Sequence, residues 1–198
     1  MNCPDPTTDP VKIRQELPQA VGCLELVSIS RGIEAADAML KAAQVQLLTS
    51  SPICPGKYVV LVGGLVAEVQ SAVQAGSAVA ADTLVDAVVI PHVHPQVLQA
   101  FTASTAPEHI AALGMLETFS VAASIIGGDA AVKAARVDLL EIRLARAMGG
   151  KAFVLLTGEV AAVRAAIEAG MAAARAQGLL LGSTVIPSPH PDLVQALI

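Results

Sequence analysis

The stretch AVGCLELVSISRGIEAADAMLKAAQVQLL at Ala20–Leu48 determines the architecture, because it recurs as ALGMLETFSVAASIIGGDAAVKAARVDLL at Ala112–Leu140. Fourteen of the 29 aligned pairs are identical, at a constant spacing of 92 positions. The agreement resumes downstream, where GKYVVLVGGLVAEVQSAVQAG matches GKAFVLLTGEVAAVRAAIEAG and VVIPHVHP matches TVIPSPHP. The duplication indicates two copies of one structural unit, and pseudo-symmetric units tend to assemble.

Both copies predict the same order of elements, strand–helix–strand–strand–helix–strand. In the first copy, hydrophobic periodicity predicts strands at Val21–Ile29, Val45–Thr49, Lys57–Val62 and Ala87–Pro91, and helices at Ile33–Ala43 and Val66–Ala80. In the second copy it predicts strands at Leu113–Val121, Val137–Glu141, Lys151–Leu156 and Ser183–Pro187, and helices at Gly128–Ala135 and Val160–Gln177. The fold class is therefore α+β, with two tandem ferredoxin-like domains, each a four-stranded antiparallel sheet with its helices on one face.

Domain boundaries follow from the repeat. We expect a flexible, proline-rich N-terminal extension at residues 1–19, a first domain at 20–101, a linker at 102–111 and a second domain at 112–198. Each domain is near the lower size at which a chain buries a sufficient core alone. Hydrophobic residues make up 54% of the chain but aromatic residues only 2%. Such a thin core, built from small aliphatic side chains, favours further burial between subunits.

Composition excludes several classes of function. No run approaches the length of a membrane-spanning helix, and the N-terminal residues lack the apolar segment of a signal peptide. A net charge of −5 argues against a nucleic-acid partner. The three cysteines have no paired spacing, which favours a reducing cytoplasm over a disulfide framework. No Walker A, GxSxG or dinucleotide-binding motif stands in a suitable context, so we predict that the chain is not an enzyme.

Three signatures carry a family resemblance: GxLE at the first strand of each copy, DAxxKAAxVxLL after it, and VIPxxHP at the end. Together they resemble the shell-protein domain of bacterial microcompartments, the BMC domain, over residues 20–198. Two copies in one chain resemble the tandem, trimeric class of that family. The ICPGK segment at Ile53–Lys57 is similar to the tandem shell proteins of propanediol-utilisation compartments. The resemblance implies a homotrimeric, pseudohexameric tile that packs against other shell proteins in the cytoplasm and encloses enzymes.

The same resemblance implies that the loop between the second and third strands of each copy lines a central pore. These loops are residues 52–57 and 146–151, so the implied pore-loop residues are Ile53, Pro55, Gly56, Lys57, Met148, Gly149 and Gly150. Proline and glycine beside Cys54 could hold its side chain rigidly at the loop tip. The second copy has no cysteine at its loop.

Cys54 has two interpretations. One thiol cannot bind an iron–sulfur cluster, since such clusters usually have four protein ligands. The resemblance implies that three copies of Cys54 hold a 4Fe-4S cluster in the pore, for electron or cluster transfer across the shell with a redox protein as partner. The alternative is an inert loop thiol. Of the other cysteines, Cys23 is predicted to fill the core and Cys3 to have no role.

Other polar residues repeat in both copies. The resemblance implies that Lys41 and Lys133 lie at the tile edge, although a solvated cation at a helix C-terminus needs no function. His92 stands where the family often has an edge arginine, and Ser188 is its counterpart. Histidines of the VIPxxHP motif are expected to stabilise turns, and the repeated carboxylates to make structural hydrogen bonds; these residues are His94, His190, Glu25, Glu117, Asp37 and Asp129.

Two other functions remain open at this point. The tile could have an empty pore and act as a metabolite conduit. The duplicated scaffold could also be a small-molecule sensor or enzyme. That last function needs a pocket between the copies with converging polar groups, which the sequence does not display.

Overall fold

The computed structural model describes residues 17–105, 107, 109–145 and 148–197. Most of the extension, including Cys3, lies outside the described residues, as do Arg146 and Ala147 of the second loop. The first copy contains β1 (Ala20–Leu26), α1 (Ile29–Ala42), β2 (Gln46–Ile53), β3 (Lys57–Gly64), α2 (Val66–Ala80), η1 (Ala81–Thr83) and β4 (Leu84–Pro91). The second contains β5 (Ala112–Thr118), α4 (Val121–Ala134), β6 (Asp138–Arg143), β7 (Ala152–Gly158), α5 (Val160–Ala176) and β8 (Leu180–Pro187). Each copy is followed by a short helix, α3 (Pro95–Ala100) or α6 (Pro191–Leu197).

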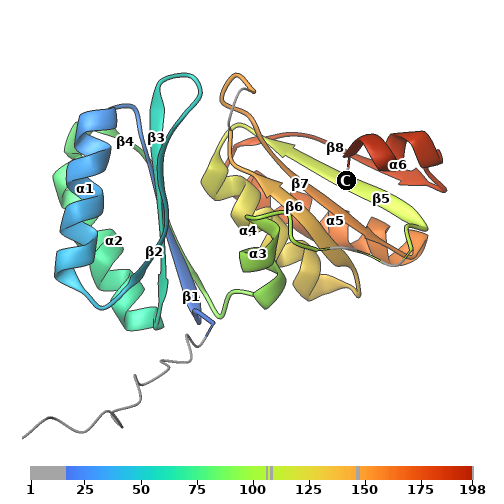
Figure 1. The fold of residues 1–198 in the computed structure, drawn as a ribbon, viewed down its shortest axis with the longest axis horizontal. Helices are drawn as coiled ribbons and strands as arrows, with labels where there is room; N and C mark the ends of the chain where they lie inside the picture. Colours follow the sequence, from blue (N-terminus) through green and yellow to red (C-terminus); the bar gives the residue numbers. More distant parts are fainter. Residues whose placement is uncertain (1–16, 106, 108, 146–147, 198) are drawn as a thin grey trace, which may run out of the picture.

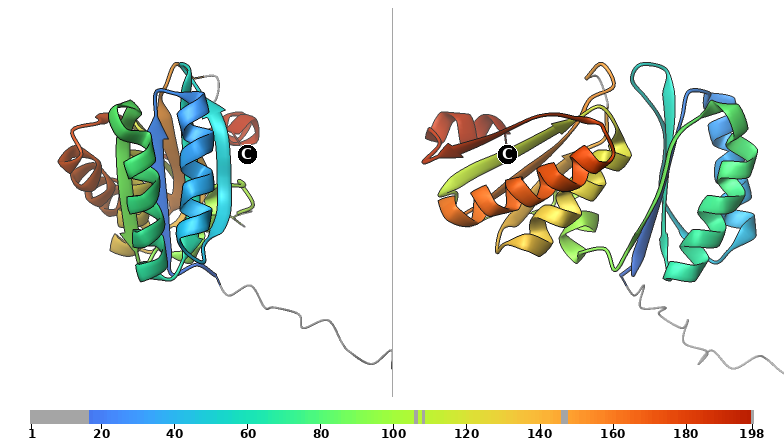
Figure 2. Two further views of the ribbon diagram at one scale, coloured as in Figure 1. Left: turned by 90° about the vertical axis from the view of Figure 1, so that its left-hand side faces the viewer. Right: turned by 180° about the vertical axis from the view of Figure 1, so that it is seen from behind.

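Each copy forms one antiparallel four-stranded sheet, ordered β2-β3-β1-β4 in the first and β6-β7-β5-β8 in the second. Two long helices cover one face of each sheet (Figure 1). In the first copy, α1 and α2 lie on the face turned away from the second copy (Figure 2). The predicted fold of two tandem ferredoxin-like units is confirmed. No helix among the described residues is long and apolar enough to cross a lipid bilayer.

The first helix of each copy begins earlier than predicted. The predicted strands reached Ile29 and Val121, but the chain already turns into α1 and α4 there. The hydroxyl of Ser28 accepts a hydrogen bond from the Arg31 amide at 3.3 Å, and Ser120 accepts one from Ala123 at 3.2 Å. A serine cap of this kind can end a strand while the hydrophobic pattern of the sequence continues. It does so because its hydroxyl accepts a hydrogen bond from a first-turn amide that would otherwise lack an acceptor.

The sequence interpretation missed the two short helices. His94 begins α3, with its Nδ1 accepting from the Gln96 amide at 3.3 Å. His190 does the same at the start of α6, accepting from the Asp192 amide at 3.2 Å. The two histidines thus stabilise the turns they were expected to stabilise. Proline follows each histidine, which suits the first position of a helix.

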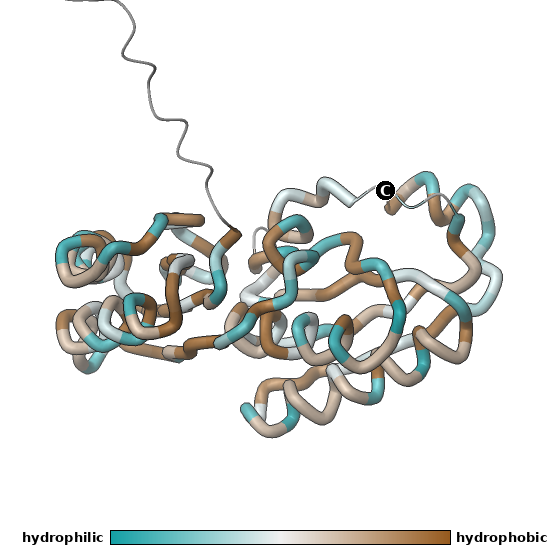
Figure 3. Tube along the Cα trace, turned by 90° about the horizontal axis from the view of Figure 1, so that it is seen from below, coloured by the Kyte–Doolittle hydropathy of each residue, from teal (hydrophilic) through white to brown (hydrophobic). Residues whose placement is uncertain are grey.

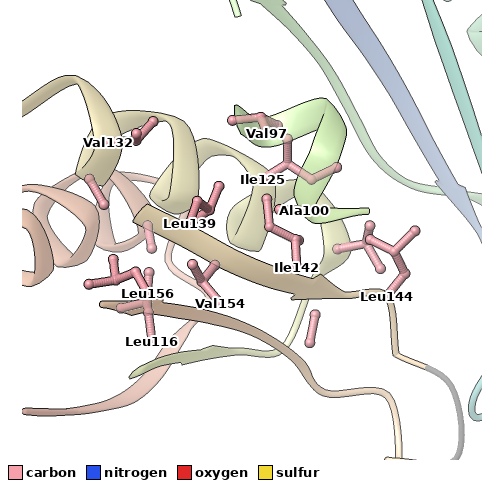
Figure 4. Close-up of a cluster of buried hydrophobic side chains, with 14 of the residues drawn as sticks. Val97, Ala100, Leu116, Ile125, Val132, Leu139, Ile142, Leu144, Val154 and Leu156 are labelled. Carbon is pink, nitrogen blue, oxygen red and sulfur yellow. The ribbon is translucent and has the colours of Figure 1, made fainter. Parts of the chain in front are cut away.

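The two copies pack head to tail. The sheet face of the first copy that carries no helix faces α4 and α3, so Val21, Cys23 and Leu61 join a core that continues into the second copy. Val97 and Ala100 of α3 are fully buried against β6, beside Leu139 and Ile142 (Figure 4). In the hydropathy view, apolar stretches occur in the strands of both copies and where the copies meet (Figure 3). The junction between the copies is therefore an apolar core, and the helix-covered face of the first sheet forms a separate cluster.

The α4–α5 crossing depends on two glycines. A Cβ built on Gly170 would lie 2.8 Å from the Gly127 carbonyl oxygen, a backbone atom that cannot move without separating the helices. We expect Gly170→Ala to lower the free energy of unfolding by about 1–2 kcal/mol, the range of overpacked cores. Chemical denaturation followed by circular dichroism measures this loss.

The counterpart Gly76 in the first copy is the matched control. Its built Cβ would meet Leu24 Cδ1 and Met39 Cγ, each at 2.6 Å. These belong to side chains that can change rotamer, so Gly76→Ala should cost less. A larger loss for Gly76→Ala than for Gly170→Ala would show that the backbone contact does not limit the crossing.

Candidate pore loops and the contact between the copies

The β2–β3 loop and the β6–β7 loop lie at the same end of the molecule and touch each other (Figure 1). The Cys54 amide donates a hydrogen bond to the Ala145 carbonyl at 3.0 Å. A Cβ on Gly150 would lie 2.9 Å from Pro55 Cδ, and Gly150 has a φ of +87°, so glycine is needed there for both reasons. The structure therefore brings the two predicted pore loops together.

The loop residues differ in exposure. Ile53 is buried and anchors the loop in the core, whereas Pro55 and Gly56 are exposed and Cys54 is half-buried. In the second loop, Met148 is half-buried, Gly149 is exposed and Gly150 is buried. Cys54 thus lies between the buried base and the exposed tip of the first loop.

Cys23 is the opposite case. It is fully buried on β1, as predicted for a core residue. Burial raises the pKa of its thiol well above the usual value, and the Glu25 and Asp86 carboxylates raise it further. Burial and the raised pKa are those of a structural core thiol rather than of a reactive one. Among the described residues of one chain, no group of three His, Cys, Asp or Glu side chains is arranged to hold a metal ion.

Lys57, predicted at the pore, points into the contact between the copies. Its ammonium group bonds Glu25 Oε1 at 2.8 Å, and Glu25 Oε2 accepts a hydrogen bond from the Val121 amide at 3.0 Å. The Glu25 side chain is fully buried. One carboxylate thus ties β1 and β3 to the first turn of α4, where the positive end of the helix dipole favours a negative charge.

The second copy repeats this pair without the helix above it. Lys151 Nζ lies 3.0 Å from Glu117 Oε1, with the two side chains 44% and 38% exposed. The ion pair of the first copy is therefore covered by α4, whereas the equivalent pair of the second copy is open to solvent.

The predicted edge lysines lie in the last turns of α1 and α4. Lys41 bonds Asp37 at 2.6 Å on an exposed surface, and Lys133 bonds Asp129 at 2.5 Å. Asp129 also accepts a hydrogen bond from the His94 amide at 2.8 Å, so this carboxylate is structural, as expected. His92 is exposed and has a φ of +50°.

A cavity of about 610 Å³ lies between the copies, beside β2, β6 and α3, and no motif in the sequence predicts it. Its charged groups, Glu141 and Arg143, bond each other through two contacts of 2.6 and 2.8 Å. Arg143 also stacks over the Phe153 ring, 4.9 Å from its centroid. Because the two charges satisfy each other, the cavity offers little to the sensor or enzyme function. Its apolar lining is Leu48, Leu61, Leu98, Phe101, Ile142 and Leu144.

Two sheets with this order, a glutamate–lysine pair present in both copies and the paired loops define a tandem-repeat protein of one class. The model of the BMC domain matches residues 20–93 and 112–189, and the chain belongs to that family. Its tandem arrangement is similar to that of the bacterial microcompartment shell protein PduT of Citrobacter freundii. The two are 43% identical over 180 residues, which cover 91% of this chain and 98% of PduT.

A shorter relative and two solved structures also come from microcompartments. The shell protein EutM of Salmonella typhimurium is 48% identical over 82 residues, which cover 41% of this chain and 83% of EutM. A crystal structure of a microcompartment protein from Desulfitobacterium hafniense is 53% identical and superposes with a TM-score of 0.83, over 89% of this chain and 98% of that one. The fused permuted hexameric shell protein MSM0275, with 20% identity and a TM-score of 0.57, shares the fold.

Proposed function

We propose that the chain is a tile of a bacterial microcompartment shell, in which three chains form a pseudohexagonal ring. The observation that carries this proposal is a difference in burial between equivalent positions. The face of the second copy that lies against the first is buried: Val121 0%, Ile125 0%, Val132 7% and Leu139 0% exposed. The equivalent face of the first copy is open: Ile29 45%, Ile33 56%, Leu40 40% and Leu47 42% exposed.

A head-to-tail contact leaves one face without a partner copy at each end of the chain, although α6 covers part of that face in the second copy. Repeating such a contact between chains gives either a closed ring or an open filament. Three chains supply six BMC domains, the number that a hexagonal tile requires. The microcompartment relatives support closure, and they support a location in a cytoplasmic shell whose edges, with Lys41, Lys133 and His92, contact other shell proteins.

We further propose that Cys54 binds a 4Fe-4S cluster shared by the trimer. The donor chemistry fits, since thiolates are the usual ligands of such clusters and Cys54 is a free, half-buried thiol beside the exposed loop tip. The bond from its amide to Ala145 holds the loop in place. When bound, the cluster would supply one-electron chemistry, and a redox protein on either side of the shell would be its partner.

Oligomeric state and iron content test both parts. We expect anaerobically purified protein to sediment as a trimer and, after reconstitution, to carry iron near one cluster per three chains. Cys54→Ser should remain a trimer and lose the iron and its electron paramagnetic resonance signal, whereas Cys3→Ser should keep both. A trimer without iron would leave the tile with an empty pore, a metabolite conduit. A stable monomer would overturn the tile itself.

A further inference from the structure

We infer that the contact between chains is closed by Glu117, whose carboxylate caps the first turn of α1 in the next chain. The inference rests on the proposed trimer and names the surfaces that form it. The partner is a second copy of this chain, because each half of the required contact already exists within one chain, on opposite ends.

Among the described residues, three hydrogen bonds from a backbone amide to a side chain join the copies within the chain. The Val121 amide donates to Glu25 at 3.0 Å, and the His94 amide donates to Asp129 at 2.8 Å. The Leu139 amide donates to the Gln96 side-chain oxygen at 2.8 Å. These bonds attach the start of α4, the end of β4 and the start of β6 to the neighbouring copy.

The repeat supplies a counterpart for every one of these groups. Glu117 corresponds to Glu25, and Ile29 at the start of α1 corresponds to Val121. The Ile29 amide stands in the first helical turn, where no intrahelical acceptor is available. Within the described residues, Glu117 makes an ion pair with Lys151 alone, so its second carboxylate oxygen remains available.

The other two hydrogen bonds between the copies also have counterparts in the repeat. His190 and Asp37 correspond to His94 and Asp129, and Asp37 already holds Lys41 as Asp129 holds Lys133. Asp192 and Leu47 correspond to Gln96 and Leu139. The donors and acceptors are therefore divided between the two free faces, the acceptor Glu117 on one and the donor Ile29 on the other.

Apolar side chains divide in the same way. Leu193 of α6 is 39% exposed, whereas its counterpart Val97 of α3 is fully buried against the second copy. Met115 and Phe153, on the face of the second sheet opposite α4 and α5, are half-buried in a cluster that also contains Val194 and Leu197 of α6. Their counterparts Cys23 and Val59 are fully buried under α4 and α3. The exposure of apolar side chains thus agrees with the polar pairing.

The contact between chains is not identical to the contact within the chain. Asp86 bonds Ser120 at 3.0 Å between the copies, but its counterpart is Gly182, which has no side chain to do so. The contact between chains therefore has one side-chain hydrogen bond fewer than the contact within the chain. Chains should therefore separate before the copies within a chain do.

The experiment compares Glu117→Ala and Glu117→Gln with Glu168→Ala, an exposed position on α5 outside the contact. We expect Glu117→Ala to weaken the trimer at least about tenfold per contact, as for loss of a hydrogen bond to a charged group, in sedimentation over a dilution series. Glu117→Gln keeps an acceptor oxygen and should retain part of the affinity. Glu168→Ala should match the wild type.

Hydrogen exchange gives a second readout, specific to the bond. The Ile29 amide should be protected in the wild-type trimer and exchange freely in Glu117→Ala, at concentrations where that variant is still assembled. Circular dichroism checks that each variant folds. A wild-type trimer whose Ile29 protection and affinity are unchanged by Glu117→Ala would overturn this inference and leave the tile intact. A wild-type monomer would instead overturn the proposed function.

Discussion

Replacing Glu25 with alanine is expected to lower the free energy of unfolding by about 3 kcal/mol, at the lower end for breaking a buried ion pair. The loss has two sources. Lys57, only 21% exposed, loses the carboxylate that neutralises it, and the buried Val121 amide loses its acceptor. Urea denaturation followed by circular dichroism, at one fixed protein concentration, measures the change.

Two variants identify the source of that loss. Glu25→Gln keeps an acceptor for the Val121 amide but leaves Lys57 without a counter-charge, so it should fall between the wild type and Glu25→Ala. Glu117→Ala removes the equivalent but exposed pair and should change the stability of the separated chain by less than about 1 kcal/mol. Equal losses for Glu25→Ala and Glu117→Ala would contradict the role of burial.

Ile125→Ala is expected to cost about 3 kcal/mol, within the usual range for removing a large aliphatic side chain from a core. Ile125 of α4 is fully buried, and it lies in the cluster that includes Val97 of α3 (Figure 4). The deletion leaves a void beneath α3, and it also weakens the packing of the first copy on the second. The loss should appear in denaturation at every protein concentration, because the contact is within one chain.

Ile33→Ala is the matched control, since the repeat places Ile33 at the same site of the first copy. Ile33 is 56% exposed, and surface substitutions usually change stability by less than about 0.5 kcal/mol. Its effect should appear instead as weaker association in sedimentation. If Ile125→Ala instead dissociated the trimer and left the free energy of unfolding unchanged, Ile125 would not belong to the core between the two copies of one chain.

The architecture could be predicted from the sequence because the duplication gives two independent hydrophobic patterns for one fold. The boundaries could not, because hydropathy continues through Val27 and Ile29 while the polar cap at Ser28 ends the strand. The α3 and α6 helices were missed for a related reason. They are too short for periodicity to detect, and the histidine caps that begin them were interpreted only as turns.

The candidate site was predictable to different degrees. The loop positions around Cys54 followed from the family resemblance, and Cys23 followed from its place on an apolar strand. The role of Lys57 did not, because the sequence cannot show that the β1 carboxylate beside it also reaches the start of α4. The burial difference between Ile33 and Ile125 was equally hidden, since identical residues in a repeat have different surroundings only in three dimensions.

The hydrogen bond from the Cys54 amide to the Ala145 carbonyl joins two unlike loops of one polypeptide. If chains close as proposed, loops with and without a thiol must alternate around the axis, because the peptide linkage prevents any other order. In an assembly of six identical single-domain subunits, either all six loops around the axis would carry a thiol or none would. Gene fusion therefore lowers the rotational symmetry from six to three, which makes an odd number of equivalent ligands available at the centre.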